Sequence, residues 1–182
     1  EEIESRLDNL AFLGINNIVV LRGDSMAGEK RFTPTSGGYR YASELVEGIR
    51  SYQGSNSYRR SRGLEADDRF FCIGVGAYPE KHFEAANIET DIQNLKRKVD
   101  AGADYIITQM FFDNNLLYNF LYKIREAGIT VPVVAGIMPI TNATQVKRAI
   151  QLSGSHMPQR FKSLVDKFGS DPAAMMQAGI AY

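Results

Sequence analysis

The chain has 182 residues, of which 44% are hydrophobic and 23% are charged. This length can bury a sizeable core within one domain, and the composition is typical of a soluble globular protein. Lys and Arg together number 21, as do Asp and Glu, so the charge balance gives no reason to expect a nucleic-acid partner or a membrane surface.

The single cysteine and the ends of the chain bear on the cellular location of the protein and on whether the sequence is an excerpt. Cys72 lies in an apolar run, which predicts a buried, inert thiol rather than a reactive one. No apolar stretch approaches the roughly 18 residues that span a bilayer, and no signal peptide is recognisable, so we expect a reducing, cytoplasmic location. The chain opens within a helical pattern that places Ile3, Leu7 and Leu10 on one face, without an initiator Met. We therefore expect an excerpt of a longer protein.

Four apolar runs rich in β-branched residues predict short strands that are buried on both faces. They lie at residues 17–21, 70–77, 105–110 and 131–137. Amphipathic helical patterns follow them, at residues 42–52, 88–101, 116–127 and 143–152. Three glycines are natural stops for these helices, namely Gly102, Gly128 and Gly154.

This alternation predicts an α/β fold with a parallel sheet and right-handed crossovers. A doubly wound sheet and a (β/α)8 barrel both fit the pattern, and four strands alone cannot close a barrel. A barrel predicts adjacent parallel strands in chain order, with helices on one side only. Residues 53–68 break the rhythm with a polar tract that carries Arg59, Arg60 and Arg62, with Arg69 just beyond. A solvated, mobile insertion is favoured there over an anion or partner contact.

In parallel α/β folds, functional groups collect where the strands end. Asp24 follows the first predicted strand, Tyr78 follows the second, and Gln109 lies within the third. Each has an ordinary alternative: a turn or helix N-cap for Asp24, a packed ring for Tyr78 and a structural amide for Gln109. We predict that these three side chains converge at one end of the sheet.

The predicted helix at 88–101 carries a polar stripe beside its apolar face. Asp91, Asn94 and Lys98 are spaced three and four residues apart, and Arg97 is adjacent. A solvated face is the usual explanation. The two histidines, His82 and His156, have no neighbours at metal-ligand spacing, so no metal site is expected, and there is no Walker-type phosphate loop or G-x-G-x-x-G motif.

Five segments, taken together, resemble the flavin-dependent methylenetetrahydrofolate reductase family in order and spacing. They are NIVVLRGD (17–24), YASELV (41–46), AYPEKHFEA (77–85), DIQNLKRKVDAGADYIITQMFFD (91–113) and GITVPVVAGIMPI (128–140). The resemblance implies a (β/α)8 TIM barrel of which this chain supplies roughly strands 4 to 7, so that residues 1–182 are the central part of one FAD-binding catalytic domain. It implies that NADH or NADPH reduces FAD, and that the flavin then reduces 5,10-methylenetetrahydrofolate to 5-methyltetrahydrofolate in one-carbon and methionine metabolism.

The same resemblance implies roles for individual residues. Asp24 resembles a catalytic carboxylate that faces the pterin and tunes the flavin, and Gln109 an amide that touches both folate and nicotinamide. Gln145 resembles a further substrate contact. The pocket at the strand ends is then expected to fit an isoalloxazine ring. The residues that resemble FAD contacts are Arg22, Gly23, Asp24, Tyr41, Ala42, Tyr78, His82, Ala85, Asp91, Asn94, Arg97 and Lys98.

The sequence departs from the family pattern at three places. Phe83 stands where a proline usually follows the histidine, and Ala149 stands where a bulky apolar residue is expected to pack on substrate. The glutamate that serves as general acid belongs to the first strand of the family's barrel, which this excerpt lacks, so we expect no turnover from the chain alone. Four strands also leave two open sheet edges and an uncovered inner face, so we expect the chain alone not to bind FAD tightly. The alternatives are a non-catalytic flavin-binding barrel module and another flavin or phosphate barrel. The oligomeric state is not fixed by the sequence, and a homo-oligomer is the expectation.

Overall fold

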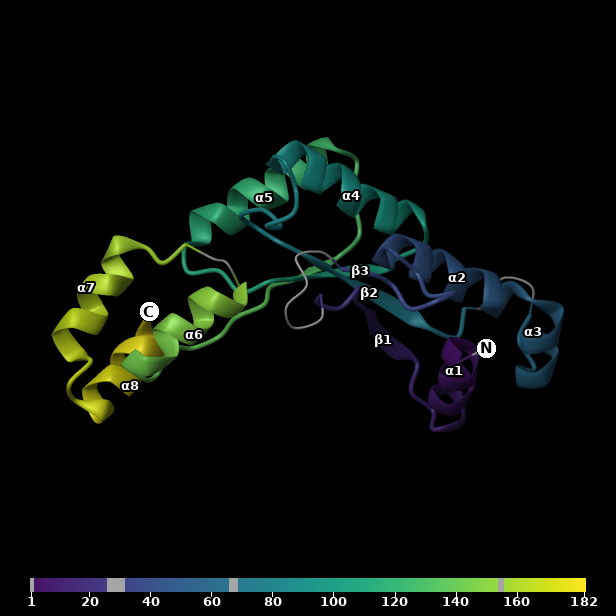
Figure 1. Cartoon of the computed structure of the whole chain (residues 1–182), viewed down its shortest axis with the longest axis horizontal. Helices are drawn as coiled ribbons and strands as arrows, with labels where there is room; N and C mark the ends of the chain where they lie inside the picture. The colour runs from purple at the N-terminus through teal and green to yellow at the C-terminus, as the bar shows by residue number, and fades with distance from the viewer. Residues whose placement is uncertain (1, 26–31, 66–68, 154–155) are drawn as a thin grey trace. The chain divides into compact units, whose positions relative to one another are not determined.

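The computed structural model describes residues 2–25, 32–65, 69–153 and 156–182 (Figure 1). Its strands form one four-stranded sheet in the order β1-β2-β3-β4. β1 and β2 are parallel, with Asn17 opposite Cys72 and Val20 opposite Val75. The α/β class and the order of the strands are therefore confirmed. The strands are β1 (Asn17–Val20), β2 (Cys72–Ala77), β3 (Tyr105–Thr108) and β4 (Val133–Val134).

Four of the helices coincide closely with the four that the apolar spacing predicts, and none of the described helices is long and apolar enough to span a bilayer. The predicted stops Gly102 and Gly128 have φ angles of 114° and 77°, as expected after a helix, whereas Gly154 lies outside the described residues. The helices are α1 (Glu2–Phe12), α2 (Ala42–Gly54), α3 (Asn56–Arg62), α4 (Ile88–Asp100), α5 (Asn114–Glu126), α6 (Ala143–Ser153), α7 (Gln159–Phe168) and α8 (Pro172–Ala181).

The chain divides into two compact units, which are described separately below. Unit 1 comprises Glu1–Gly76, Gln93–Ile107 and Val131–Val133. Unit 2 comprises Ala77–Ile92, Thr108–Thr130 and Val134–Tyr182.

In unit 1, the two faces of the sheet differ in burial. Val20, Ile73 and Val75 are buried, and the register places Val20 beside Val75 on one face. Helix α2 contacts β1 and buries Val46. On the alternate face, Val19 is 45% exposed, and Gly74 lies under the ring of Tyr105, where a Cβ would overlap that ring. The first face is therefore the more completely buried of the two, although the Tyr105 ring also covers Gly74 on the alternate face, and helices on one side of the whole sheet stay a prediction.

Arg50 ties three segments of unit 1 together. Its guanidinium donates to the carbonyl oxygens of Phe71 at 2.8 Å and Gly102 at 2.7 Å, and it pairs with the carboxylate of Asp104. Asp104 in turn accepts the backbone N–H of Ile73 at 2.7 Å. Because Arg50 is only 14% exposed, these contacts fix α2 against the start of β2 and the turn before β3.

The insertion after α2 is partly a packed helix, so the predicted solvated, mobile segment is wrong for residues 56–62. Ser55 caps α3 by accepting the Tyr58 N–H at 3.3 Å, and Gly63 ends it with a φ of 64°. Tyr58 is 3% exposed, with its ring 5.1 Å from that of Tyr52. The charged and polar sequence did not predict this helix, because one buried ring, rather than an apolar stripe, packs it against its surroundings. Residues 66–68 of the tract lie outside the described residues.

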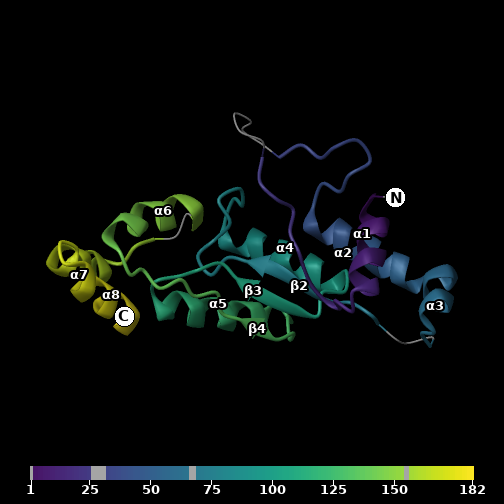
Figure 2. The ribbon, with the colours of Figure 1, turned by 90° about the horizontal axis from the view of Figure 1, so that it is seen from below.

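The core of unit 2 joins the loops after β3 and β4 to the last three helices. α7 and α8 pack side by side (Figures 1 and 2), and the Gly179 Cα lies so close to the Ile140 carbonyl that a Cβ there would overlap it. The buried residues of this core are Phe112, Ile140, Ala149, Met157, Phe161 and Met175.

Two predictions about single elements need correction. The fourth strand has two residues rather than seven, because the N–H of Gly136 is taken by the Thr108 hydroxyl at 2.9 Å instead of a strand backbone. Cys72 is only partly buried, since β2 begins at the margin of the sheet there, so the predicted burial of the thiol is confirmed only in part.

Candidate functional site

The segment after β1 carries Arg22, Gly23 and Asp24 in unit 1. Gly23 has a φ of 83°, a conformation that glycine adopts without strain. The Arg22 guanidinium lies over the ring of Phe32, 5.1 Å from its centre. Asp24 is exposed in irregular backbone and caps none of the described helices. Its carboxylate is therefore accessible to a ligand, as the functional interpretation requires.

Tyr41 and Ala42 lie at the start of α2 in the same unit. The Glu44 carboxylate accepts the backbone N–H groups of Arg40 at 2.7 Å and Tyr41 at 3.1 Å, which satisfies donors that a helix start leaves open. The side chain of Tyr41 is 52% exposed, whereas Ala42 is buried. Of the pair, Tyr41 can offer a side chain to a ligand.

In unit 2, the loop after β2 brings Tyr78, His82 and Asp91 together. The edge of the Tyr78 ring meets the His82 ring with 4.7 Å between centroids and an interplanar angle of 87°. Asp91, in the first turn of α4, accepts the backbone N–H of His82 at 2.8 Å. Ala85 is partly buried, and its N–H donates to the His82 carbonyl at 3.0 Å. Asp91 thus positions the loop, a role that the stripe pattern alone did not reveal.

The remaining stripe residues of α4 lie in unit 1 and also have partners. Arg97 is exposed and donates to the amide oxygen of Asn94 at 3.1 Å. The Lys98 ammonium donates to the Gly76 carbonyl at 2.8 Å, which places a positive charge beside the end of β2. The stripe is therefore not simply a solvated face.

Gln109 follows β3 in unit 2 and is half-buried. Its backbone N–H donates to the Ala77 carbonyl at 2.7 Å, and its side-chain oxygen accepts the N–H of Met110 at 2.9 Å. The amide oxygen is thus committed locally, and the structure shows no partner for the NH2 group within the described residues. Gln109 retains two donors for a ligand.

The two positions on α6 that were expected to touch substrate make contacts within the protein itself. Gln145 is partly buried, and its side-chain oxygen accepts the Thr141 N–H at 3.0 Å, which closes the turn before the helix. Ala149 is 0% exposed within the unit 2 core, so it offers no surface to a substrate.

Sequence reasoning missed the side chains that hold the loop after β2. The Lys81 ammonium donates to the carbonyl oxygens of His82 at 3.0 Å and Ala85 at 2.5 Å. The Glu80 carboxylate accepts the His156 N–H, with both oxygens at 2.9 Å. A glutamate and a lysine in a polar loop look like ordinary surface residues, and no periodicity distinguishes them.

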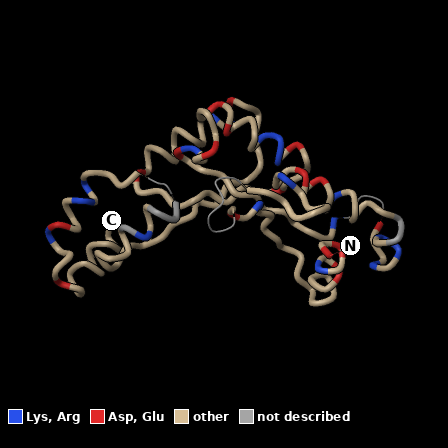
Figure 3. The backbone as a smooth tube through the Cα atoms, in the orientation of Figure 1, with Lys and Arg blue, Asp and Glu red and all other residues tan. Residues whose placement is uncertain are grey.

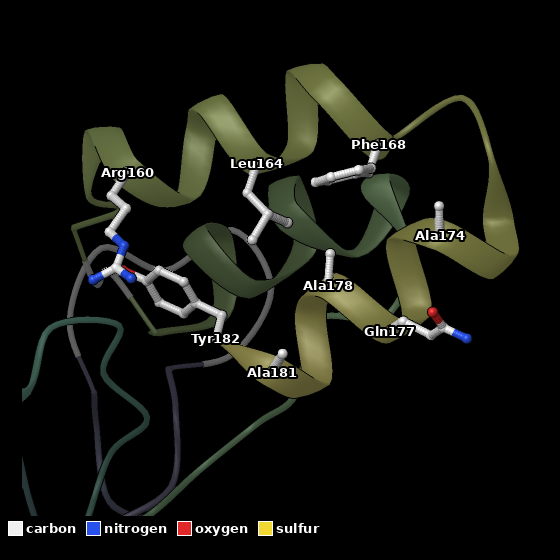
Figure 4. Close-up of a pocket in the computed structure, with 8 residues that line it drawn as sticks. All are labelled: Arg160, Leu164, Phe168, Ala174, Gln177, Ala178, Ala181 and Tyr182. Atoms are coloured by element: carbon white, nitrogen blue, oxygen red, sulfur yellow. The ribbon is translucent and has the colours of Figure 1, made fainter.

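The described cavity lies elsewhere, between α7 and α8 of unit 2 (Figure 4). It has a volume of about 490 Å³ and is largely apolar, with Arg160 against the Tyr182 ring at one end. None of the expected site residues lines it. Acidic and basic residues are interspersed along the described chain (Figure 3), so its charge distribution does not mark a site.

The candidate residues are thus divided between the units. Tyr78, His82, Asp91 and Gln109 belong to unit 2, and Asp24 belongs to unit 1. Convergence of Asp24 with Tyr78 and Gln109 therefore stays a prediction.

A parallel sheet whose strands are followed by accessible carboxylate, amide and aromatic groups defines an α/β protein of the type that binds ligands at strand ends. A family-wide comparison matches residues 1–182 to "Methylenetetrahydrofolate reductase". The chain belongs to the methylenetetrahydrofolate reductase family.

Individual relatives agree with this assignment. Methylenetetrahydrofolate reductase 2 of Saccharomyces cerevisiae is 37% identical over 179 residues, which cover 97% of this chain and 28% of the yeast protein. Methylenetetrahydrofolate reductase (NADH) 1 of Zea mays is 35% identical over 99% of this chain and 30% of its own. The 5,10-methylenetetrahydrofolate reductase of Escherichia coli is 37% identical over 87% of this chain and 46% of its own. The chain thus spans less than half the length of these relatives.

Proposed function

We propose that the chain is part of an enzyme that reduces 5,10-methylenetetrahydrofolate to 5-methyltetrahydrofolate with NADH or NADPH through bound FAD. The observation that carries the proposal is the match to one reductase family along all of residues 1–182, including the loops that follow the strands. The resemblance of those loops extends to the carboxylate, amide and aromatic residues that this chemistry uses.

The residues present fit a flavin dinucleotide by the chemistry of their donors. In unit 1, Arg97 and Lys98 carry positive charge on α4, as a pyrophosphate requires. In unit 2, Tyr78 and His82 offer aromatic and polar groups. Bound FAD would accept hydride from the nicotinamide and deliver hydride to the folate. The set proposed to hold it comprises Arg22, Gly23, Asp24, Tyr41, Ala42, Tyr78, His82, Ala85, Asp91, Asn94, Arg97 and Lys98.

For the substrates, we assign the two donor hydrogens of the Gln109 side chain to the folate and nicotinamide groups in turn. Asp24 presents its exposed carboxylate to the pterin. Gln145 contributes through its NH2 group only, because Thr141 engages its side-chain oxygen.

The proposed architecture is a (β/α)8 barrel in which β1 to β4 are strands 4 to 7, and in which residues 1–182 form the central part of one FAD-binding domain. The sequential strand order and the parallel pairing of β1 with β2 support it. Relatives are named for different dinucleotides, NADH in Zea mays and NADPH in Caenorhabditis elegans, and the residues give no preference for either. A homo-oligomer and a cytoplasmic location stay predictions.

The test is a flavin absorbance spectrum of the purified full-length protein. We expect a bound-flavin spectrum that NADH or NADPH bleaches and that 5,10-methylenetetrahydrofolate restores. A protein that retains no flavin would contradict the proposal. Bleaching without recovery would favour the second candidate, a non-catalytic flavin-binding module, which has one observation on its side: Ala149 is buried and offers no substrate contact.

A further inference from the structure

The loop between β2 and α4 has His82 at its centre. Asp91 accepts the His82 N–H at 2.8 Å, and the His82 carbonyl accepts from the Lys81 ammonium and the Ala85 N–H, both at 3.0 Å. The backbone of His82 is therefore fixed on both sides by hydrogen bonds, two of which involve a charged side chain.

The imidazole ring of His82 is also oriented. The Glu84 N–H donates to Nδ1 at 3.1 Å, so Nδ1 carries the lone pair and the proton of the neutral ring resides on Nε2. The structure thus assigns His82 one tautomer, in which Nε2–H is the donor.

Two aromatic rings flank this imidazole. Tyr78 meets it edge-on, and Phe83 stacks on it with 4.6 Å between centroids and an interplanar angle of 26°. The side chain of Phe83 is nevertheless 74% exposed. Phe83 thus stacks on His82 while most of its own surface faces water.

We infer that Phe83 is a positioning residue, which holds the plane of the His82 imidazole so that Nε2–H donates to an oxygen acceptor on the ribityl-phosphate arm of FAD. This inference rests on the proposed function. Phe83 is also the position at which the sequence departs from the family pattern. The proline that is usual there has no aromatic face to stack on an imidazole.

The loop offers a way to separate ring orientation from folding. Asp91 and Lys81 hold the backbone of His82 without any contribution from the Phe83 side chain. The ring plane, and with it the Glu84 hydrogen bond to Nδ1, is what we infer to depend on the stacked Phe83 ring. Phe83→Leu removes the aromatic face and keeps an apolar side chain of similar exposure, and Phe83→Tyr keeps the face. Tyr118→Leu is the matched control, because Tyr118 is a 61% exposed aromatic residue on α5 outside the loop.

The experiment uses the full-length protein with 15N-labelled histidine, the His82 signals being assigned from a His82→Gln variant. Two readouts are taken: the side-chain 15N shifts, which report the tautomer, and the affinity of the apoprotein for FAD. Because aromatic pairs contribute roughly 0.5–1.5 kcal/mol, Phe83→Leu is expected to weaken FAD binding about three- to tenfold and to shift the His82 signals toward a mixture of tautomers. Phe83→Tyr and Tyr118→Leu are expected to stay within about twofold of wild type, a difference of roughly 0.4 kcal/mol.

Unchanged FAD affinity in Phe83→Leu overturns the inference, and so does weaker affinity with unchanged His82 signals, because Phe83 would then act on the ligand without involving the histidine. A wild-type protein that binds no FAD refutes the proposed function instead. In that case, the His82 signals of Phe83→Leu still decide whether Phe83 orients the ring.

Discussion

Gly48 in α2 shows how one missing side chain supports the candidate site. A Cβ on Gly48 would overlap the Tyr39 hydroxyl, so Gly48→Ala is expected to displace that ring and loosen the segment that leads to Tyr41. Because Tyr39 is 39% exposed and can move, and because Ala favours a helix over Gly, we expect a change of less than about 1 kcal/mol in the free energy of unfolding, measured with urea, but weaker FAD binding. Gly54→Ala is the control, because nothing lies within 4 Å of a Cβ there, and it is expected to be neutral or stabilising.

Asp24 can be tested as the residue that adjusts the flavin. Asp24→Asn in the full-length enzyme removes a negative charge, which raises the flavin potential and so favours accepting hydride over donating it. Stopped-flow measurement of the two half-reactions is expected to show folate reduction slowed more than flavin reduction by NADH or NADPH. Equal slowing of both halves would count against this role.

The sequence predicted which types of side chain occur at the candidate site better than it predicted their hydrogen-bond partners. Exposed Asp24 and half-buried Gln109 were predictable, because each interrupts or follows an apolar strand. The partners of Asp91 were not predictable, since a loop backbone nine residues away leaves no periodic trace. Ala149 also needed the structure, because full burial in a core depends on helices that come later in the chain.

Among the structural elements, the join between α2, β2 and β3 depends on Arg50. Arg50→Met leaves the Asp104 carboxylate and the Phe71 and Gly102 carbonyls without that donor, and a loss of about 2–4 kcal/mol in unfolding free energy is expected. Arg50→Lys is expected to recover only part of this, because an ammonium lacks the planar fork. Urea unfolding measures both.

The matched control for Arg50 is Arg6→Met. Arg6 pairs with Glu2 at 2.8 Å, but both side chains are more than two-thirds exposed, at 74% and 80%. Exposed pairs of this kind contribute little, so a change below about 0.5 kcal/mol is expected. Comparable losses at Arg6 and Arg50 would show that burial of the Arg50 contacts is not what stabilises unit 1.

The elements that sequence periodicity predicted best are those that bury a continuous apolar stripe. α4 and α5 are of this kind. α3 was missed because its stability comes from one buried tyrosine and two caps. β4 was predicted too long because the Gly136 N–H donates to the hydroxyl of Thr108, a residue of β3, and not to a strand backbone. Periodicity reports amphipathicity, and neither a single buried ring with two caps nor a hydroxyl from another strand produces an amphipathic pattern.

For the molecule as a whole, tyrosines set the response to alkaline pH. Burial, reinforced by the hydrogen bond to Asp8, raises the pKa of Tyr52 from 10.0 to about 12. Since the folded-state pKa is raised, the stabilisation is fully present below pH 10 and is lost as pH rises through about 12. Burial likewise raises the pKa values of Tyr58, Tyr105 and Tyr182.

The unfolding free energy is therefore expected to fall between pH 10 and 12, as measured by urea titration at each pH. Tyr52→Phe, which has no phenol to ionise, is expected to start lower and to fall less steeply over this window. Parallel slopes for the two proteins would mean that Tyr52 makes no measurable contribution.

The Lys81 ammonium has a consequence for how the molecule tolerates chemical modification. It serves as an internal cation, which gathers the His82 and Ala85 carbonyls. Acylation would neutralise this amine and remove the charged donor that the two carbonyl oxygens share, whereas reductive methylation would preserve the charge. The order of the loop is therefore linked to the charge of one amine, and reagents that acylate lysine would disturb it more than reagents that alkylate lysine.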